Sequence, residues 1–206
     1  MNKDQLKLYL VTDRRMIGER SLEDIVVDAV RGGVSMVQLR EKDTDTRDFL
    51  QIANGLLSVL SPLGIPLIIN DRVDIALACG ADGVHLGQSD MPYEDARRLL
   101  GDGRIIGLSA ENIAQVESAN SLDVDYIGIS PVFSTRTKTD TMQPFGLDGL
   151  RSAAGISKHP LVAIGGINSS NASAVMRSGA TGIAVVSAIM GSASPYEAAK
   201  ELREIC

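Results

Sequence analysis

Short apolar runs recur along this chain, and most of them end abruptly in a cluster of polar residues. The run at 67–69 is followed by Asn70, Asp71 and Arg72, and the run at 162–164 is followed by two glycines. Apolar runs bounded in this way, with helical periods between them, are typical of buried parallel strands. Ligands bind beyond the carboxyl ends of such strands, so we expect the polar clusters to converge on one site.

The alternation of strand and helix periods predicts eight strand–helix pairs. The predicted strands lie near 8–12, 36–40, 66–70, 83–86, 105–109, 126–130, 160–164 and 182–186. The predicted helices lie near 21–31, 44–60, 72–79, 91–100, 112–120, 147–156, 169–178 and 195–205. The expected helix starts are Ser21 with Asp24, Thr44, Pro92 in a first turn, and Ser169 or Ser170.

Eight such pairs in 206 residues predict a (β/α)₈ TIM barrel that occupies the whole chain, 1–206, as a single domain. The alternative is an open, doubly wound sheet, which normally has fewer strands and a glycine-rich phosphate loop after its first strand. No glycine-rich turn follows the first predicted strand here. The sequence therefore favours the barrel.

Composition narrows the classes of partner. The net charge is −6, Trp is absent, and Phe and Tyr number three and four, which argues against a nucleic-acid surface. Two cysteines, Cys79 and Cys206, form neither a disulfide framework nor a metal-ligand spacing, which indicates a reducing, cytoplasmic compartment. No apolar run approaches the roughly 18 residues of a membrane helix, so we expect no membrane association.

The ends of the last two strands carry a candidate phosphate site. Gly165 and Gly166 follow the seventh predicted strand, and Val186 and Ser187 end the eighth. In TIM barrels the loops after these two strands often hold a phosphate group. The alternative is that the two glycines only make a tight turn.

The second predicted strand carries Gln38, Arg40 and Lys42 at alternate positions, which places all three side chains on one face. Buried donors of this kind require acceptors, and an anionic ligand would supply them. The alternative is an ion-pair layer inside the barrel, formed with Glu41 or another neighbour.

Two carboxylates follow neighbouring strands: Asp71 after the third and Asp90 after the fourth. Together they form a candidate Mg²⁺ site, because Mg²⁺ is commonly held by one or two carboxylates and by substrate phosphates. Two alternatives stay open: Asp90 caps the helix that begins near Pro92, and Asp71 pairs with Arg72.

The longest predicted loop, 131–146, follows the sixth strand and contains Thr135, Arg136, Thr137 and Lys138. Hydroxyls beside cations suit an oxygen-rich anion, and loops of this length are often functional, as lids are. The alternative is a solvated polar loop.

The two histidines, His85 and His159, are expected to be structural. No Ser/His/Asp or Cys/His arrangement recurs along the chain, so nucleophilic hydrolysis is not supported.

Seven segments, in order, resemble the thiamin phosphate synthase family over essentially the whole chain. They are Tyr9 to Asp13 (YLVTD), Gln38 to Lys42 (QLREK), Ile69 to Arg72 (INDR), His85 to Asp90 (HLGQSD), Gly107 to Ser109 (GLS), Thr135 to Lys138 (TRTK) and Ile164 to Ile167 (IGGI).

The resemblance implies a transferase that joins hydroxymethylpyrimidine diphosphate to hydroxyethylthiazole phosphate, or to its carboxylated form, with release of pyrophosphate. It implies that the pyrimidine diphosphate is bound by Gln38, Arg40, Lys42, Asn70, Ser109 and Lys138, of which Arg40, Ser109 and Lys138 are catalytic. It further implies that Asp71 and Asp90 hold Mg²⁺ and that the thiazole phosphate is bound by Thr135, Thr137, Gly166, Val186 and Ser187. No protein nucleophile is needed on this scheme, because the aminopyrimidine stabilises the cation left behind when pyrophosphate departs.

Two other functions remain open: a thiazole tautomerase of similar fold, and a non-catalytic regulator that binds a phosphate ligand. The partners we expect are the small-molecule substrates and, in a homodimer, a second copy of the chain.

Overall fold

Eight parallel strands close into a barrel, as the sequence predicts. The computed structural model describes residues 1–134 and 143–206. Each strand pairs in parallel with the next, and β8 pairs with β1 to close the ring. The strands are β1 Leu8–Val11, β2 Met36–Leu39, β3 Leu67–Asn70, β4 Gly83–Leu86, β5 Ile105–Ala110, β6 Tyr126–Ile129, β7 Leu161–Ile164 and β8 Gly182–Val185.

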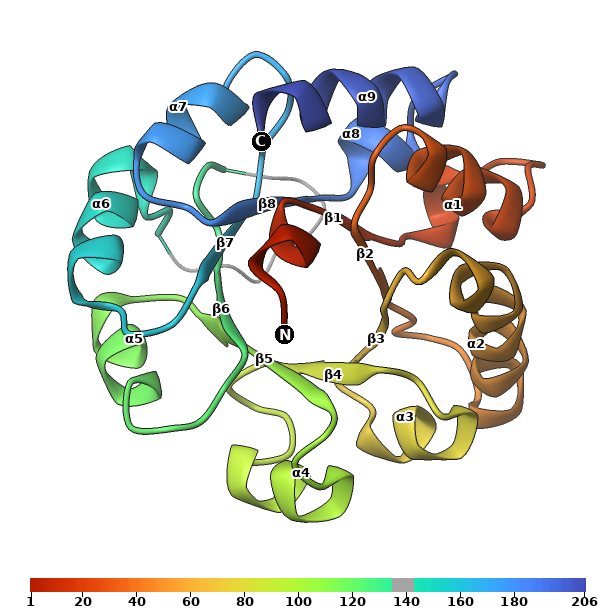
Figure 1. Ribbon diagram of the computed structural model, residues 1–206, viewed down its shortest axis with the longest axis horizontal. Coiled ribbons are helices and arrows are strands. Elements are labelled where there is room, and N and C mark those ends of the chain that lie inside the picture. The colour runs from red at the N-terminus through yellow and green to blue at the C-terminus, as the bar shows by residue number, and fades with distance from the viewer. Residues whose placement is uncertain (135–142) are drawn as a thin grey trace.

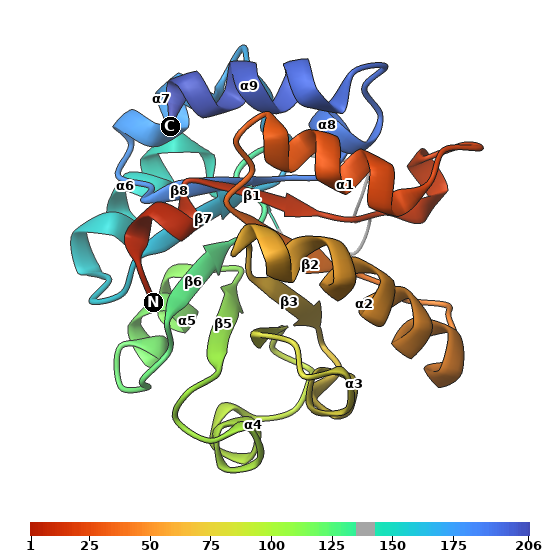
Figure 2. The same cartoon turned by 45° about the vertical axis from the view of Figure 1, so that its right-hand side comes forward.

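Helices surround the barrel on its outer side (Figure 1), and the turned view shows α1, α2 and α9 outside the strands (Figure 2). They are α1 Leu22–Arg31, α2 Thr46–Leu60, α3 Val73–Cys79, α4 Tyr93–Leu100, α5 Ile113–Ala119, α6 Gly146–Ile156, α7 Ala172–Arg177, α8 Ser187–Met190 and α9 Pro195–Ile205. The sequence did not predict α8 or the 3₁₀ helices Lys3–Leu6, Arg14–Met16 and Ser61–Leu63.

One predicted helix start is confirmed and one is wrong. The Ser21 side chain accepts a hydrogen bond from the Asp24 amide at the start of α1. Asp45, not Thr44, caps α2. The Thr44 hydroxyl donates instead to the Glu41 carboxylate, at 2.6 Å, so it is not available to the helix.

Two further starts also differ from the prediction. Pro92 precedes α4 as its cap residue and does not lie in the first turn. Asn171, not Ser169 or Ser170, precedes α7. The Ser170 hydroxyl donates to Asn168 within the preceding turn, at 2.6 Å.

The apolar core has two parts. The larger lies between the barrel and the helices. The smaller fills the barrel interior and consists of Leu6, Tyr9, Val11, Met36, Ile68, Tyr126, Val162 and Ala184.

The N-terminal 3₁₀ helix covers the amino-terminal end of the barrel, in front of its centre in Figure 1, and inserts the fully buried Leu6. A Cβ atom at Gly182 would lie 1.7 Å from the Leu6 carbonyl oxygen, so only glycine allows this approach. The barrel is thus filled at this end, and free space is left at the other. In the described part of the chain, no helix has the length and apolarity needed to cross a membrane.

Candidate active site

A cavity of about 480 Å³ lies at the carboxyl ends of the strands. Ten of the thirteen predicted site residues line it: Gln38, Arg40, Lys42, Asn70, Asp71, Asp90, Ser109, Gly166, Val186 and Ser187. The other three, Thr135, Thr137 and Lys138, lie outside the described residues, as does half of the loop proposed as a lid, residues 135–142. The structure therefore brings the described candidates together, while their individual roles stay predictions.

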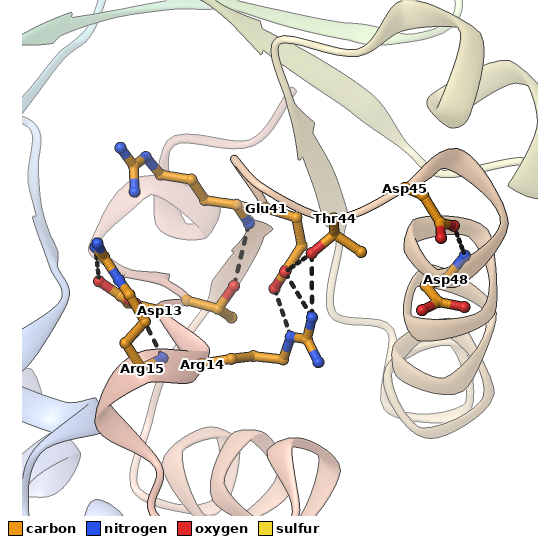
Figure 3. Close-up of polar contacts among 9 residues, drawn as sticks. Asp13, Arg14, Arg15, Glu41, Thr44, Asp45 and Asp48 are labelled. Atoms are coloured by element: carbon orange, nitrogen blue, oxygen red, sulfur yellow. Dashed lines mark hydrogen bonds and ion pairs between the residues drawn. The ribbon is translucent and has the colours of Figure 1, made fainter.

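The Arg40 side chain projects into this cavity without the partner that the ion-pair alternative requires. Glu41 accepts two hydrogen bonds from Arg14, each of 2.9 Å, and a third from Thr44 (Figure 3). Within residues 1–134 and 143–206 the Arg40 guanidinium makes no ion pair. The alternative of an Arg40–Glu41 pair inside the barrel is wrong, because the Glu41 carboxylate is bound by Arg14 and Thr44.

A second contact holds the backbone beside Arg40. The Arg40 amide donates to the buried hydroxyl of Thr12, at 3.1 Å. The next residue, Asp13, accepts hydrogen bonds from the guanidinium and the amide of Arg15 (Figure 3). The hydrogen bond from Arg15 lowers the pKa of the Asp13 carboxyl below its ordinary value of 3.8. The first strand end is thereby fixed against the second.

Asp71 and Asp90 lie side by side in the cavity. Asp71 has a left-handed backbone, with φ 63°, and its carboxylate accepts from Lys42 Nζ at 2.5 Å. The Asp90 carboxylate accepts from the Gly87 amide at 2.7 Å. Burial, and after it the adjacent Asp71, raise the pKa of Asp90 above 3.8. Two acidic groups held this close favour a bound cation.

Neither alternative for these carboxylates is correct. Pro92 precedes α4 with no side-chain cap, so Asp90 does not cap that helix. Arg72 pairs with Asp74 at 2.6 Å, not with Asp71.

The donor set fits Mg²⁺ bound together with a substrate. In the described ranges no three His, Cys, Asp or Glu residues gather as a complete metal cage. Mg²⁺ does not require one, since it is usually held by one or two carboxylates, by waters and by substrate phosphates. The buried amide nitrogen of Asn70, next to Asp71, has no hydrogen-bond acceptor among the described residues, as expected of a group that donates to an anionic ligand when one is bound.

The glycine turn after β7 is a structural requirement. Gly165 and Gly166 have φ values of 108° and 65°. A Cβ atom would lie 2.7 Å from Pro131 Cβ at the first position, and 2.9 Å from Phe133 Cβ at the second. The two glycines therefore make a tight turn, and because both also line the cavity beside Ser187, the phosphate site stays a prediction.

Sequence reasoning missed three residues inside the barrel. Tyr9 and Tyr126 lie in the cavity wall with their hydroxyls 2.9 Å apart, and burial raises the pKa of both phenols. His85, expected to be structural, lines the same cavity and hydrogen-bonds Ser109 and Tyr126. The available signal was a tyrosine in an otherwise aliphatic strand, because a buried hydroxyl needs a partner. His159 lies elsewhere, with its Nε2 3.2 Å from the Ala119 carbonyl.

Comparison with known proteins places this site in a family. The sequence profile of the thiamine monophosphate synthase family matches residues 8–189. The chain belongs to that family. A thiamine-phosphate synthase from Albidiferax ferrireducens is 56% identical over 200 residues, which cover 97% of this chain and 91% of the relative. A thiamine-phosphate synthase from Clostridium novyi is 49% identical over 199 residues, which cover 97% and 98%.

Comparison with solved structures supports the assignment to the thiamine monophosphate synthase family. The thiamine phosphate pyrophosphorylase of Pyrococcus furiosus superposes with a TM-score of 0.90 at 39% identity, over 98% of this chain and 96% of that one. A 3-hexulose-6-phosphate synthase superposes at 0.70 with 17% identity, over 97% of this chain and 99% of that one, which shows a shared barrel fold alone.

Proposed function

We propose that this chain uses the described cavity to join hydroxymethylpyrimidine diphosphate to hydroxyethylthiazole phosphate, or to its carboxylated form, releasing pyrophosphate. The observation that carries the proposal is the meeting, in one cavity, of the two cations after β2, the carboxylate pair after β3 and β4, and the glycine turn after β7. The activity of the family, the condensation of a pyrimidine diphosphate with a thiazole phosphate, is the activity of this chain.

The diphosphate binds among the positive groups. Arg40 and Lys42 reach the cavity from the segment after β2, and Lys138 would approach from the loop after β6. The unpartnered Asn70 amide donates to a diphosphate oxygen, while Gln38 and Ser109 hold the pyrimidine. Mg²⁺ held by Asp71 and Asp90 would supply further positive charge against the leaving group.

The chain's own residues act on the leaving group. Breaking the bond between the pyrimidine methylene carbon and the diphosphate oxygen moves negative charge onto pyrophosphate. Arg40 and Lys138 stabilise that charge, because donors already in place lower the barrier. The aminopyrimidine stabilises the cationic carbon, and the thiazole nitrogen attacks it.

The thiazole phosphate binds at the opposite wall of the cavity. Gly166 lets the backbone approach the phosphate, and Val186 and Ser187 lie beside it at the start of α8. Thr135 and Thr137 would complete this side. Correct placement of the thiazole nitrogen then supplies much of the rate enhancement.

Pyrophosphate release on mixing the two substrates with Mg²⁺ tests the proposal. A thiazole tautomerase would convert its thiazole without the pyrimidine substrate, and a regulator would release nothing. Arg40→Ala should reduce release by on the order of 10²-fold. Arg98→Ala is the matched control, because Arg98 is an exposed arginine on α4 that pairs with Asp95.

We also propose a cytoplasmic location and a homodimer. Both cysteines are free, in keeping with a reducing compartment. Fractionation of cells and light scattering of the purified protein test the two statements.

A further inference from the structure

A chain of hydrogen bonds crosses the interior of the barrel and joins two of the proposed substrate-binding residues. Gln38 Nε2 donates to the Tyr9 hydroxyl at 2.8 Å, and the hydroxyls of Tyr9 and Tyr126 are 2.9 Å apart. His85 Nδ1 lies 2.9 Å from the Tyr126 hydroxyl, and its Nε2 lies 2.9 Å from Ser109 Oγ. Five strands thus contribute one member each.

The barrel is built to accommodate this chain. A Cβ atom at Gly107 would lie 2.1 Å from Tyr126 Cζ, and one at Gly128 would lie 3.0 Å from His85 Cε1. The His85 and Tyr126 rings stack with their centroids 5.5 Å apart. Two strand positions are therefore kept free of side chains where these rings lie.

Because the hydroxyls are buried, the direction of each hydrogen bond in this series depends on the direction of the others. Tyr9 and Tyr126 are 1% and 0% exposed, and Gln38 is 5% exposed, so their polar groups find hydrogen-bond partners mainly in one another. If the Tyr9 oxygen accepts from Gln38, the Tyr9 hydroxyl donates to Tyr126, and the Tyr126 hydroxyl in turn donates to His85 Nδ1.

The remaining steps follow from the chemistry of imidazole. A neutral ring that accepts at Nδ1 carries its proton on Nε2. In this order a neutral His85 would donate from Nε2 to Ser109 Oγ, and the Ser109 hydroxyl would donate toward the cavity. At the other end of the chain, Gln38 keeps its carbonyl oxygen as an acceptor.

We propose that Tyr9, Tyr126 and His85 are positioning residues, which fix Gln38 as an acceptor and Ser109 as a donor toward the ligand. Reversing one hydrogen bond requires reversing the others, so the two ends change together. The inference rests on the proposed function for its substrate, an aminopyrimidine, whose amino group can donate to one end and whose ring nitrogen can accept from the other.

The tautomer of His85 in the ligand-free protein tests the direction of these hydrogen bonds. The protein has two histidines, so ¹⁵N NMR of the imidazoles gives few signals, and His159→Gln assigns them. We expect His85 to carry its proton on Nε2 alone. In Tyr126→Phe, where Nδ1 loses its donor, we expect a mixture of tautomers. A proton on Nδ1 in the unmodified protein, or an unchanged tautomer in Tyr126→Phe, would overturn the inference.

Binding measurements test the consequence for the substrate. Tyr126→Phe should weaken binding of the pyrimidine diphosphate about tenfold, which is about 1.4 kcal/mol, and leave the affinity for inorganic pyrophosphate with Mg²⁺ unchanged. Tyr93→Phe is the matched control, because it removes a hydroxyl that donates to the Asp123 carbonyl outside the cavity. Equal losses for both ligands, or no loss for the pyrimidine diphosphate, would contradict the inference.

A double variant separates positioning from general packing. If Tyr126 acts through Ser109, Tyr126→Phe should have little further effect on pyrimidine binding in a Ser109→Ala background, whereas additive losses would oppose the inference. Tyr9→Phe interrupts the same chain at another point and replaces Tyr126→Phe if that variant does not fold. If the unmodified protein releases no pyrophosphate from the two substrates, the proposed function fails, and the tautomer result alone decides this inference.

Discussion

Replacing Gly166 by Ala separates the strain of its backbone from the crowding around it. Gly64 provides a matched reference, since its φ is 66° against 65° at Gly166. No atom lies within 4 Å of a Cβ placed on Gly64, whereas a Cβ on Gly166 would lie 2.9 Å from Phe133 Cβ and 3.0 Å from the Ser134 carbonyl oxygen. The pair therefore shares the backbone penalty and differs in the steric one.

The magnitudes follow from these two contributions. A left-handed alanine costs about 1 kcal/mol, which is the whole effect expected for Gly64→Ala. Crowding in a packed region adds about 1–3 kcal/mol, so Gly166→Ala should lower the free energy of unfolding by about 2–4 kcal/mol. For a domain of this size, we expect Tm to fall by about 2–4 °C in the first variant and by about 5–15 °C in the second.

Urea unfolding and thermal scans of both variants measure the difference, and calorimetry with the thiazole phosphate measures the function. At a temperature where Gly166→Ala is folded, its affinity for the thiazole phosphate should fall and that for the pyrimidine diphosphate should not. Equal destabilisation of the two variants would refute the crowding argument. A shared loss of both affinities would refute the assignment of this turn to one substrate.

Three further predictions concern charged groups. Asp71→Asn and Asp90→Asn should each raise the Mg²⁺ concentration needed for activity and lower kcat by on the order of 10²-fold. In titrations of activity against Mg²⁺, the double variant should be little worse than the less active single variant. Losses that multiply in the double variant would oppose a shared cation. Lys138→Ala should lower kcat by on the order of 10²–10³-fold with an unchanged Tm, and a normal kcat would remove this lysine from the reaction. Asp13→Asn should destabilise the protein by about 1 kcal/mol at pH 7. Because Arg15 lowers the pKa of Asp13 in the folded state, this loss should shrink as the pH falls below 3.8, and an equal loss at pH 7 and pH 3 in urea unfolding would contradict the assignment.

The barrel could be predicted because its strands are short, aliphatic and separated by regular helices. The helix ends were harder to predict, because capping depends on which hydroxyl is still available. Thr44 and Ser170 are good capping residues by type, yet both donate to loop side chains that only the folded structure brings near. A local pattern cannot show that competition.

The candidate site also has a part that could be predicted from local sequence and a part that could not. The alternation of Gln38, Arg40 and Lys42 is a property of one strand, and the structure brings all three to the cavity. The pairing of Lys42 with Asp71 depends on a left-handed backbone at the aspartate, for which the sequence carries no mark.

The hydrogen bonds that link Tyr9, Tyr126 and His85 inside the barrel could not be predicted either, because they too depend on tertiary structure. Tyr9 and Tyr126 are 117 positions apart and meet only because the register of a closed barrel places them at one level. Tyr9 lies between two leucines, and Asp125, the polar neighbour of Tyr126, accepts from the Ile106 amide, so neither sequence context reveals the contact. A buried tyrosine in an aliphatic strand indicates that a partner exists, but it does not say which one.

The plug formed by Leu6 has a kinetic consequence. With the amino-terminal end of the barrel filled, molecules enter and leave the cavity through the opposite end. If the pyrimidine binds deep in the cavity and the thiazole phosphate binds near Gly166 and Ser187, as proposed, we expect the pyrimidine to enter first. On that arrangement, steady-state kinetics should show ordered binding of the two substrates through the single open end of the barrel.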